Sequence, residues 1–398
     1  MKRWGEAVGT IFLSAVVVTA SWAYQSDVNA TPVGEASLAD KSAVSLSCQR
    51  SLDMPRRPSR EWRVATGIRA SSWQWVEPAK RVGQVRVSVV NAEPGRAQVR
   101  PIGRIPTMTD PDQVAGRSAT LAAINGDFFD TLPKGDALPQ GALITDTRPI
   151  FVPAGWSRVV TWNANNRLRT THVSLDASLA TASQSWPVDA LNDPTVRGRQ
   201  IAVMNADWHR THVPDGMAGV VVKGETVVAR YPNSKDLKVP RGGYIIVADS
   251  VDALPSLVVD DRVELELSYT SSNHQDIVHA AGHGGIALRE GQLERICSPY
   301  ESIPRPRSML AWNEDGRIWL LAASSGLPDA ADGIRRGGLT KEELARVART
   351  LGATTAVVLD GGGSTALFAR KGAHTKRMDM PPESWLRPVP VVWQLLGS

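Results

Sequence analysis

The chain has 398 residues, of which 42% are hydrophobic and 21% are charged, so it can bury a sizeable globular core. Lysine and arginine number 45 against 40 aspartates and glutamates, and the net charge of +5 is small for this length. This mixed surface, with no basic run interleaved with aromatic residues, excludes the electrostatic footprint of a nucleic-acid-binding protein.

The N-terminus has the pattern of a secretory signal peptide. Lys2 and Arg3 precede the apolar stretch Val8–Ala20, which ends in the small residues of SWA. We therefore expect residues 1–23 to be removed and the mature protein to be secreted or extracytoplasmic. An uncleaved membrane anchor is the alternative, but this run is short for a span and no later stretch is long and apolar enough to cross a bilayer.

A polar spacer, rich in proline and arginine near its end, is expected over residues 24–63, and a folded domain over residues 64–398. The two cysteines are Cys48 and Cys297. An isolated pair in an exported chain can form one disulfide, and two unpaired thiols are the alternative. Neither cysteine has the spacing of a metal site.

Runs of β-branched and apolar residues predict strands through most of the domain. The expected strands cover residues 82–90, 158–163, 219–231 (two strands joined by a glycine turn), 243–248 and 262–269, and residues 313–323 predict a hairpin with an Asp-Gly turn. A helix is expected after Thr340, whose side chain would form a capping box with Glu343, and Gly352 would end it. Strands outnumber helices, so the predicted fold class is α+β, dominated by sheet with a few helices.

The sequence LDGGGSTALF, residues 359–368, places an acid and a glycine turn directly after an apolar strand. Glycines let the backbone adopt positive φ and approach a ligand, and successive amides in such a turn can bind an anion. A tight turn between strands is the alternative. Because binding groups collect in loops at strand ends, the acid favours function. The candidate residues are Asp360, Gly361, Gly362, Gly363 and Ser364.

A second strand ends in INGDFF, which contains Asn125, Gly126 and Asp127. The side chains of Asn125 and Asp127 could point into a site walled by the two phenylalanines. The alternative is an Asn-Gly turn with both phenylalanines in the core.

Two further stretches contribute His283, which lies among glycines, and Arg307 with Ser308 at the start of a strand. A lone histidine is more often structural, although the flanking glycines give it little to pack against. A guanidinium matches phosphate oxygens with two parallel hydrogen bonds, so Arg307 is a candidate anion clamp. An exposed loop arginine is the alternative.

These four stretches, in this order, resemble the phosphodiester glycosidase family. The matching motifs are INGDFF, GHGGIALREG, the Arg307–Ser308 pair ahead of NEDGRIWLL, and GLTKEELARVARTLGATTAVVLDGGGSTALF. The resemblance runs from about Val82 to the C-terminus and includes QGALI and VPRGGYIIVA. It implies a phosphodiester-glycosidase-like domain.

Three positions depart from the family pattern. The chain reads ASSG at residues 323–326, where many members have Asp-Gly-(Arg/Gln), so a carboxylate that often lines this loop is absent. His283 replaces a common glycine and Gly285 replaces a common proline. Because of these differences, the resemblance does not determine the exact substrate or establish activity.

The resemblance implies hydrolysis of a sugar-1-phosphodiester at the glycosidic bond, which releases the sugar and leaves a phosphomonoester. Arg307 and the amides of residues 361–364 would stabilise the growing phosphate charge. Asp360 and Asp127 are the catalytic candidates, because a carboxylate is needed to activate water or to stabilise an oxocarbenium-like centre. The expected substrate-binding residues are Asn125, Gly126, His283, Arg307, Ser308, Gly361, Gly362, Gly363 and Ser364.

The expected partner is a glycosyl phosphodiester or a phosphate-containing glycan, and no cofactor is required by the pattern. Paired carboxylates could hold a divalent cation, but no dense cluster of acids demands one. Two other classes stay open: a metal-assisted phosphodiesterase that cleaves the P–O bond, and a non-catalytic wall-glycan-binding protein on the same fold. Chelator sensitivity would indicate the first, and tight binding without turnover the second.

Overall fold

The computed structural model describes residues 52, 54–77, 83–132, 135–210, 212–233, 235, 237–274, 276–294, 304–325, 337–380 and 385–398. The predicted signal peptide and both cysteines lie outside these residues, so export and the Cys48–Cys297 pairing stay predictions. Most of the predicted spacer also lies outside them, and the first strand begins at Arg60, just before the predicted start of the domain.

An antiparallel eight-stranded sheet contains the segments that carry three of the four predicted motifs. Its strand order is β1 (Arg60–Ala65), β2 (Ile68–Glu77), β3 (Gly83–Ala92), β23 (Ile318–Ser324), β22 (Arg307–Trp312), β24 (Thr355–Leu359), β20 (Ile286–Arg289) and β21 (Gln292–Leu293). The predicted hairpin is formed by β22 and β23, which pair from Arg307 with Ala323 to Trp312 with Ile318 around the Asp-Gly turn.

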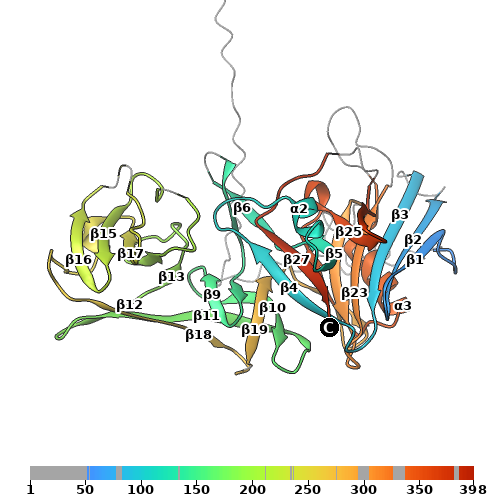
Figure 1. Cartoon of the computed structure of the whole chain (residues 1–398), viewed down its shortest axis with the longest axis horizontal. Coiled ribbons are helices and arrows are strands. Elements are labelled where there is room, and N and C mark those ends of the chain that lie inside the picture. The colour runs from blue at the N-terminus through green and yellow to red at the C-terminus, as the bar shows by residue number, and fades with distance from the viewer. Residues whose placement is uncertain are drawn as a thin grey trace, which may run out of the picture. The chain divides into compact units, whose positions relative to one another are not determined.

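A five-stranded sheet, here the C-terminal sheet, contains the strand that ends in INGDFF. Its order is β26 (His374–Arg377), β25 (Leu367–Lys371), β5 (Thr120–Asn125), β27 (Val391–Gly397) and β4 (Ala97–Gly103). The last strand, β27, therefore lies between β4 and β5, as Figure 1 shows.

The remaining strands form a seven-stranded sheet, a second five-stranded sheet (the small sheet) and a short ribbon. The seven-stranded sheet has the order β12 (Ser185–Pro187), β11 (Leu168–Ala180), β10 (Ser157–Asn163), β19 (Ile277–Gly282), β8 (Leu143–Thr145) and β9 (Arg148–Phe151), with β18 (Glu264–Ser271) also paired to β11. The small sheet has the order β13 (Ala190–Leu191), β14 (Ala202–Met204), β17 (Gly243–Ala248), β15 (Ala218–Lys223) and β16 (Thr226–Tyr231). The ribbon pairs β6 (Phe129–Thr131) with β7 (Ala137–Pro139).

The central strands of the eight-stranded sheet are buried on both faces. Successive residues of a strand point to opposite faces, and accordingly Val89 and Leu321 pack in one apolar cluster with Leu344 of the helix α3 (Lys341–Thr350). Their neighbours Val90 and Leu320 pack in another cluster with residues of the C-terminal sheet. The seven-stranded sheet and the small sheet share a separate core. The candidate site lies where several of these sheets meet.

The predicted helix is confirmed as α3, and its capping box forms as expected. The Thr340 hydroxyl accepts a hydrogen bond from the Glu343 amide at 3.1 Å, and the Glu343 carboxylate accepts one from the Thr340 amide at 2.9 Å. Gly352, at φ +98°, follows the helix in the left-handed conformation that favours glycine.

The predicted dominance of sheet is confirmed, but the label α+β fits only loosely. Among the described residues α-helix is limited to α3 and the five-residue α2 (Pro111–Ala115), and 3₁₀ turns include η2 (Val251–Ala253) and η3 (Gly362–Ser364). The motifs predicted strands well because alternating or β-branched runs are local signals. No helix in the described ranges is both long and apolar enough to span a membrane.

Candidate active site

The four predicted stretches come together at the ends of strands from three sheets. β5 ends at Asn125, β24 ends at Leu359 and β19 ends at Gly282, while β22 begins beside the end of β24, with Ser308 opposite Leu359. Backbone hydrogen bonds join the loops that follow: the Asp360 amide donates to the Gly126 carbonyl at 3.0 Å, and the Gly284 amide donates to the Val358 carbonyl at 2.9 Å.

The side-chain amide of Asn125 links these loops and is fully buried. Its Nδ2 donates to the Asp360 carbonyl at 2.7 Å, and its Oδ1 accepts from the Ser308 hydroxyl at 2.6 Å and from the Ala366 amide at 3.1 Å. Because a carbonyl oxygen has two lone pairs, the acceptor capacity of Oδ1 is filled. The observed role of Asn125 and Ser308 is thus structural, and their predicted contact with substrate stays a prediction.

Asp127 is almost completely enclosed, with only 2% of its surface exposed. Its Oδ1 accepts from the Phe128 amide at 2.8 Å and its Oδ2 from the Gly141 amide at 2.6 Å. A Cβ at Gly282 would lie 1.9 Å from Oδ2, so a side chain at that position would collide with the carboxyl group. Glycine is needed there because the carboxyl group occupies the space.

Burial and, to a smaller extent, the nearby Asp360 carboxylate raise the pKa of Asp127 to about 7, against the opposing effect of the two amides and Arg158. Burial also raises the pKa of Asp360, although Ser364, the Gly361 amide, Arg387 and Arg307 favour its charged form. The Ser364 hydroxyl is buried nearby without the geometry of a hydrogen bond. Both carboxyl groups of the site therefore have raised pKa values.

The glycine turn has the predicted backbone, but its amides are mostly used within the protein. Gly362 has φ +57°, and a Cβ at Gly361 would lie 2.8 Å from the Pro306 carbonyl oxygen. The Gly361 amide donates to Asp360 Oδ1 at 2.8 Å, the Gly362 amide to the Pro306 carbonyl at 2.9 Å and the Ser364 amide to the Gly361 carbonyl at 3.1 Å. Protein acceptors already occupy these three amides, and the phosphate cradle across residues 361–364 stays a prediction.

Side-chain cations are the better candidates for holding an anion at this turn. Arg307 is buried and lies against the turn, since a Cβ at Gly361 would be 3.6 Å from its Cδ. Arg387 lies against the same turn at Gly363, where a Cβ would be 3.8 Å from its Cδ. The guanidinium of Arg387 also stacks on Phe129, with its central carbon 4.7 Å from the ring centroid.

Arg387 and its neighbour Trp385 were not among the predicted site residues. Trp385 is 61% exposed and lies beside Gly363, at the same distance from a Cβ there as Arg387. The signal that could have found them is the run WLRP shortly before the last strand, in which an aromatic ring and a cation precede a proline. Exposed aromatic residues at a polar site are typical of carbohydrate-binding surfaces, where sugar rings stack on them.

His283 lies next to this centre but faces a different cavity. It is buried, and its Nδ1 accepts from the Gly285 amide at 3.0 Å, so its proton is on Nε2. Burial, with the nearby charge of Arg158, lowers its pKa to about 4, which leaves the ring neutral at pH 7. It lines a cavity of about 380 Å³ together with Arg158, His172, Asn273, Arg289 and Glu294. Gly285 has φ +134°, which a proline cannot adopt, so this departure from the family pattern changes the loop.

Among the described residues, no three His, Cys, Asp or Glu side chains are grouped so that they could hold a metal ion. The carboxyl pair itself supplies only two candidate ligands. Each Asp127 oxygen accepts from one amide.

The phosphodiester glycosidase family model matches residues 216–396, which include His283, Arg307 and Asp360 but not Asn125 or Asp127. The resemblance found from the motifs is confirmed over that range. Comparison with curated proteins finds no match.

Among solved structures, a hypothetical protein from Synechocystis is similar with a TM-score of 0.65 and 24% identity, over 84% of this chain and 63% of that chain. The present chain thus spans less than two thirds of that protein. A protein from Burkholderia pseudomallei is similar with a TM-score of 0.61 and 17% identity, over 79% of this chain and 74% of that chain. These two structures share the fold. The catalytic domain of zebrafish N-acetylglucosamine-1-phosphodiester alpha-N-acetylglucosaminidase is similar with a TM-score of 0.42 and 10% identity, over 86% of this chain and 87% of that chain.

We expect Asn125→Ala to destabilise the protein more than Ser308→Ala. The first change leaves the Ser308 hydroxyl, the Ala366 amide and the Asp360 carbonyl without their partner, and each buried group left unpaired costs about 1–3 kcal/mol. Ser308→Ala removes one hydrogen bond, and Asn125 Oδ1 still accepts from the Ala366 amide. Urea unfolding measures both losses, and equal losses would show that Asn125 does not hold the loops together.

The raised pKa of Asp127 predicts a pH dependence of stability. The folded protein keeps the proton on Asp127 up to about pH 7, whereas the unfolded chain releases it near the ordinary pKa of 3.8. The folded state binds more protons in this window, so Asp127 makes the free energy of unfolding fall as the pH rises from about 4 to 7. The expected size is about 1.4 kcal/mol for each unit by which the two pKa values differ.

Asp127→Asn removes this titration, so the free energy of unfolding of the variant should rise relative to the wild type across that pH window. Urea unfolding at several pH values measures the difference. The exposed Asp252→Asn serves as the control and should follow the wild type. Parallel curves for Asp127→Asn and the wild type would show that Asp127 titrates normally.

Proposed function

Because residues 216–396 of this chain match the phosphodiester glycosidase family, we propose that it hydrolyses a sugar-1-phosphodiester at the glycosidic bond. The observation that best supports this proposal is the pair of carboxyl groups with raised pKa values beside two arginines on one glycine turn. This reaction needs a carboxyl group near the anomeric carbon and cations for the leaving phosphate, and these residue types support the proposal.

The leaving group determines what the cations do. As the bond between the anomeric carbon and the phosphate oxygen breaks, the phosphodiester monoanion becomes a phosphomonoester dianion. Arg307 and Arg387 lie close enough to influence the Asp360 carboxylate, so they can also stabilise charge that grows beside it. This stabilisation needs no proton transfer to the leaving oxygen.

The two carboxyl groups have different access to a substrate. Asp360 is half-buried, whereas only 2% of Asp127 is exposed. We therefore assign Asp360 to the anomeric carbon, where it activates water or stabilises the oxocarbenium-like centre. Asp127 is a positioning residue. Its carboxyl group changes charge near pH 7, and that charge determines how strongly it repels the Asp360 carboxylate.

Asp360→Asn is nearly isosteric and removes the charge and the capacity to act as a base, so it should lower turnover of a sugar-1-phosphate methyl diester by roughly a hundredfold or more. Asp252→Asn is the matched control and should keep wild-type activity. Melting temperature measured on the same samples separates chemistry from folding. An Asp360→Asn variant that is active but less stable would reduce Asp360 to a residue that supports the turn.

Hydrolysis in ¹⁸O-labelled water identifies the bond that breaks. Label in the released sugar supports glycosidic cleavage, and label in the phosphate supports the alternative phosphodiesterase.

A specific observation favours a second candidate, a non-catalytic glycan-binding protein: Ser324 and Ser325 are buried where many family members carry an acid. Saturable glycan binding without turnover by the wild type would support that function.

Export is a proposal that rests on residues 1–23 alone. If the signal peptide is cleaved after Ala23, protein recovered outside the cytoplasm should begin at Tyr24. N-terminal sequencing checks this expectation. Recovery of intact protein beginning at Met1 from the cytoplasm would contradict it.

A further inference from the structure

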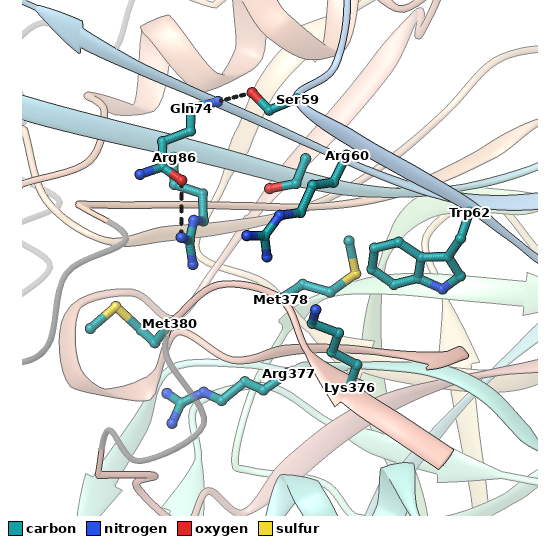
Figure 2. A pocket seen from close by; sticks show the side chains of 10 residues that line it. Ser59, Arg60, Trp62, Gln74, Arg86, Lys376, Arg377, Met378 and Met380 are labelled. Carbon is teal, nitrogen blue, oxygen red and sulfur yellow. Dashed lines mark hydrogen bonds between the residues drawn. The ribbon is translucent and has the colours of Figure 1, made fainter. Parts of the chain in front are cut away.

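A cationic pocket of about 270 Å³ lies between the edge of the eight-stranded sheet and strand β26 of the C-terminal sheet. Figure 2 shows the side chains of Arg60 and Arg86 pointing from their strands toward the segment that carries Lys376 and Arg377. None of the four motifs contributes to its lining, which consists of Ser59, Arg60, Trp62, Ser72, Gln74, Arg86, Lys376, Arg377, Met378 and Met380.

The charges of this pocket are not balanced by its own lining, which includes no carboxylate. Arg377 forms a buried ion pair with Asp379 at 3.2 Å, and Asp379 also accepts from the Leu367 amide at 3.0 Å, so that carboxylate is already engaged. No ion pair within the described ranges involves Arg60, Arg86 or Lys376. Three cations therefore converge on one cavity.

Two effects disfavour the charged forms of these cations: they repel one another, and burial removes part of their hydration. Burial lowers the pKa of Arg86, and the charge of Arg60 lowers it further, against the smaller opposing effect of Asp379. The pKa of Lys376 is also lowered, by burial and then by Arg60, Lys371 and Arg86. A cluster of like charges at the rim of a cavity lowers stability unless an anion binds there.

The pocket also has a rigid apolar wall. The Trp62 indole is fixed by a hydrogen bond from its Nε1 to the Arg370 carbonyl at 2.9 Å, and the Lys376 ammonium lies 5.9 Å from its ring centroid. Met378 and Met380 line the same cavity. Arg86 is oriented by a hydrogen bond to Gln74 Oε1 at 3.1 Å, which leaves its other guanidinium donors available to a ligand. An oriented guanidinium beside an aromatic face suits a ligand with an anionic group and a ring.

We propose that this pocket binds a phosphorylated sugar, with its phosphate held by Arg60, Arg86 and Lys376 and its ring against Trp62. A phosphate offers several oxygens to three convergent cations, and a guanidinium binds it through two parallel hydrogen bonds. The site is separate from the Asp127–Asp360 centre and does not depend on the reaction proposed there. It gives the protein a second point of attachment to a phosphate-bearing carbohydrate.

Isothermal titration of the Asp360→Asn protein with glucose 6-phosphate tests the site, with glucose and inorganic phosphate as the separate halves of the ligand. Glucose 6-phosphate should bind more tightly than either half. Arg86→Gln or Lys376→Gln should raise the dissociation constant by about tenfold or more, because each removes a charged partner of the phosphate. Arg69→Gln is the matched control: it removes a cation that is 65% exposed on neighbouring β2, outside the pocket, and should leave binding unchanged.

Melting temperature without ligand provides a second measurement. If the pocket is an unfilled anion site, Arg86→Gln should melt at the same temperature as its parent or higher, because repulsion is relieved. Equal binding by Arg86→Gln and its parent, or equal losses in Arg86→Gln and Arg69→Gln, would overturn the site. Inorganic phosphate binding as tightly as glucose 6-phosphate would overturn the contribution of Trp62. If the wild type does not hydrolyse a sugar-1-phosphodiester, that result contradicts the proposed reaction and leaves the proposed pocket unaffected.

Discussion

The candidate active site depends on one buried side-chain amide, that of Asn125. It joins the end of β5 to the start of β22 and to both ends of the loop from Asp360 to Ala366. Unpaired polar groups are costly in a buried environment, so these partners have few alternative arrangements. The positions of Asp127, two residues along the chain, and of Asp360, whose carbonyl is held directly, follow from that constraint.

The same close approach produces the electrostatics of the site. Bringing two strand ends together encloses the Asp127 carboxyl group and half-buries Asp360, and burial is the main cause of the raised pKa of each. Gly282 leaves room for the Asp127 carboxyl group, and Gly361 leaves room for the Pro306 carbonyl. The glycines of these motifs therefore act through the space they leave at least as much as through their amides.

Local patterns were enough to predict the strands, the β22–β23 hairpin and the capped helix, because the determinants of each lie within a few residues of one another. The motifs also identified the residues that gather at the site. The partners of Asn125 could not be predicted in this way, since its hydrogen bond to Ser308 crosses 183 positions of the sequence. The sequence also suggested that the amides of the glycine turn were available to bind an anion. The Pro306 carbonyl, which accepts from the Gly362 amide, is distant in the chain and could not be predicted as a partner.

Cations were the hardest groups to place from the sequence. Arg387 and the members of the cationic pocket are ordinary surface residues when considered one at a time, and each acquires a role only from neighbours distant in the chain. The three cations lie on different strands: Arg60 on β1, Arg86 on β3 and Lys376 on β26. Because Lys376 is far along the chain from Arg60 and Arg86, no local sequence pattern connects them. Arginine and lysine are also frequent on any protein surface, so their number carries little information about where they converge.

The position of β27 has a consequence for biosynthesis. This strand is made after every other described strand, yet it fills the gap between β4 and β5, which are made early. Until residues 391–397 have left the ribosome, β4 and β5 have exposed edges, and β5 cannot hold Asn125 in its final surroundings. The nascent chain therefore emerges with an incomplete sheet, and the site can assemble only after β27 has emerged.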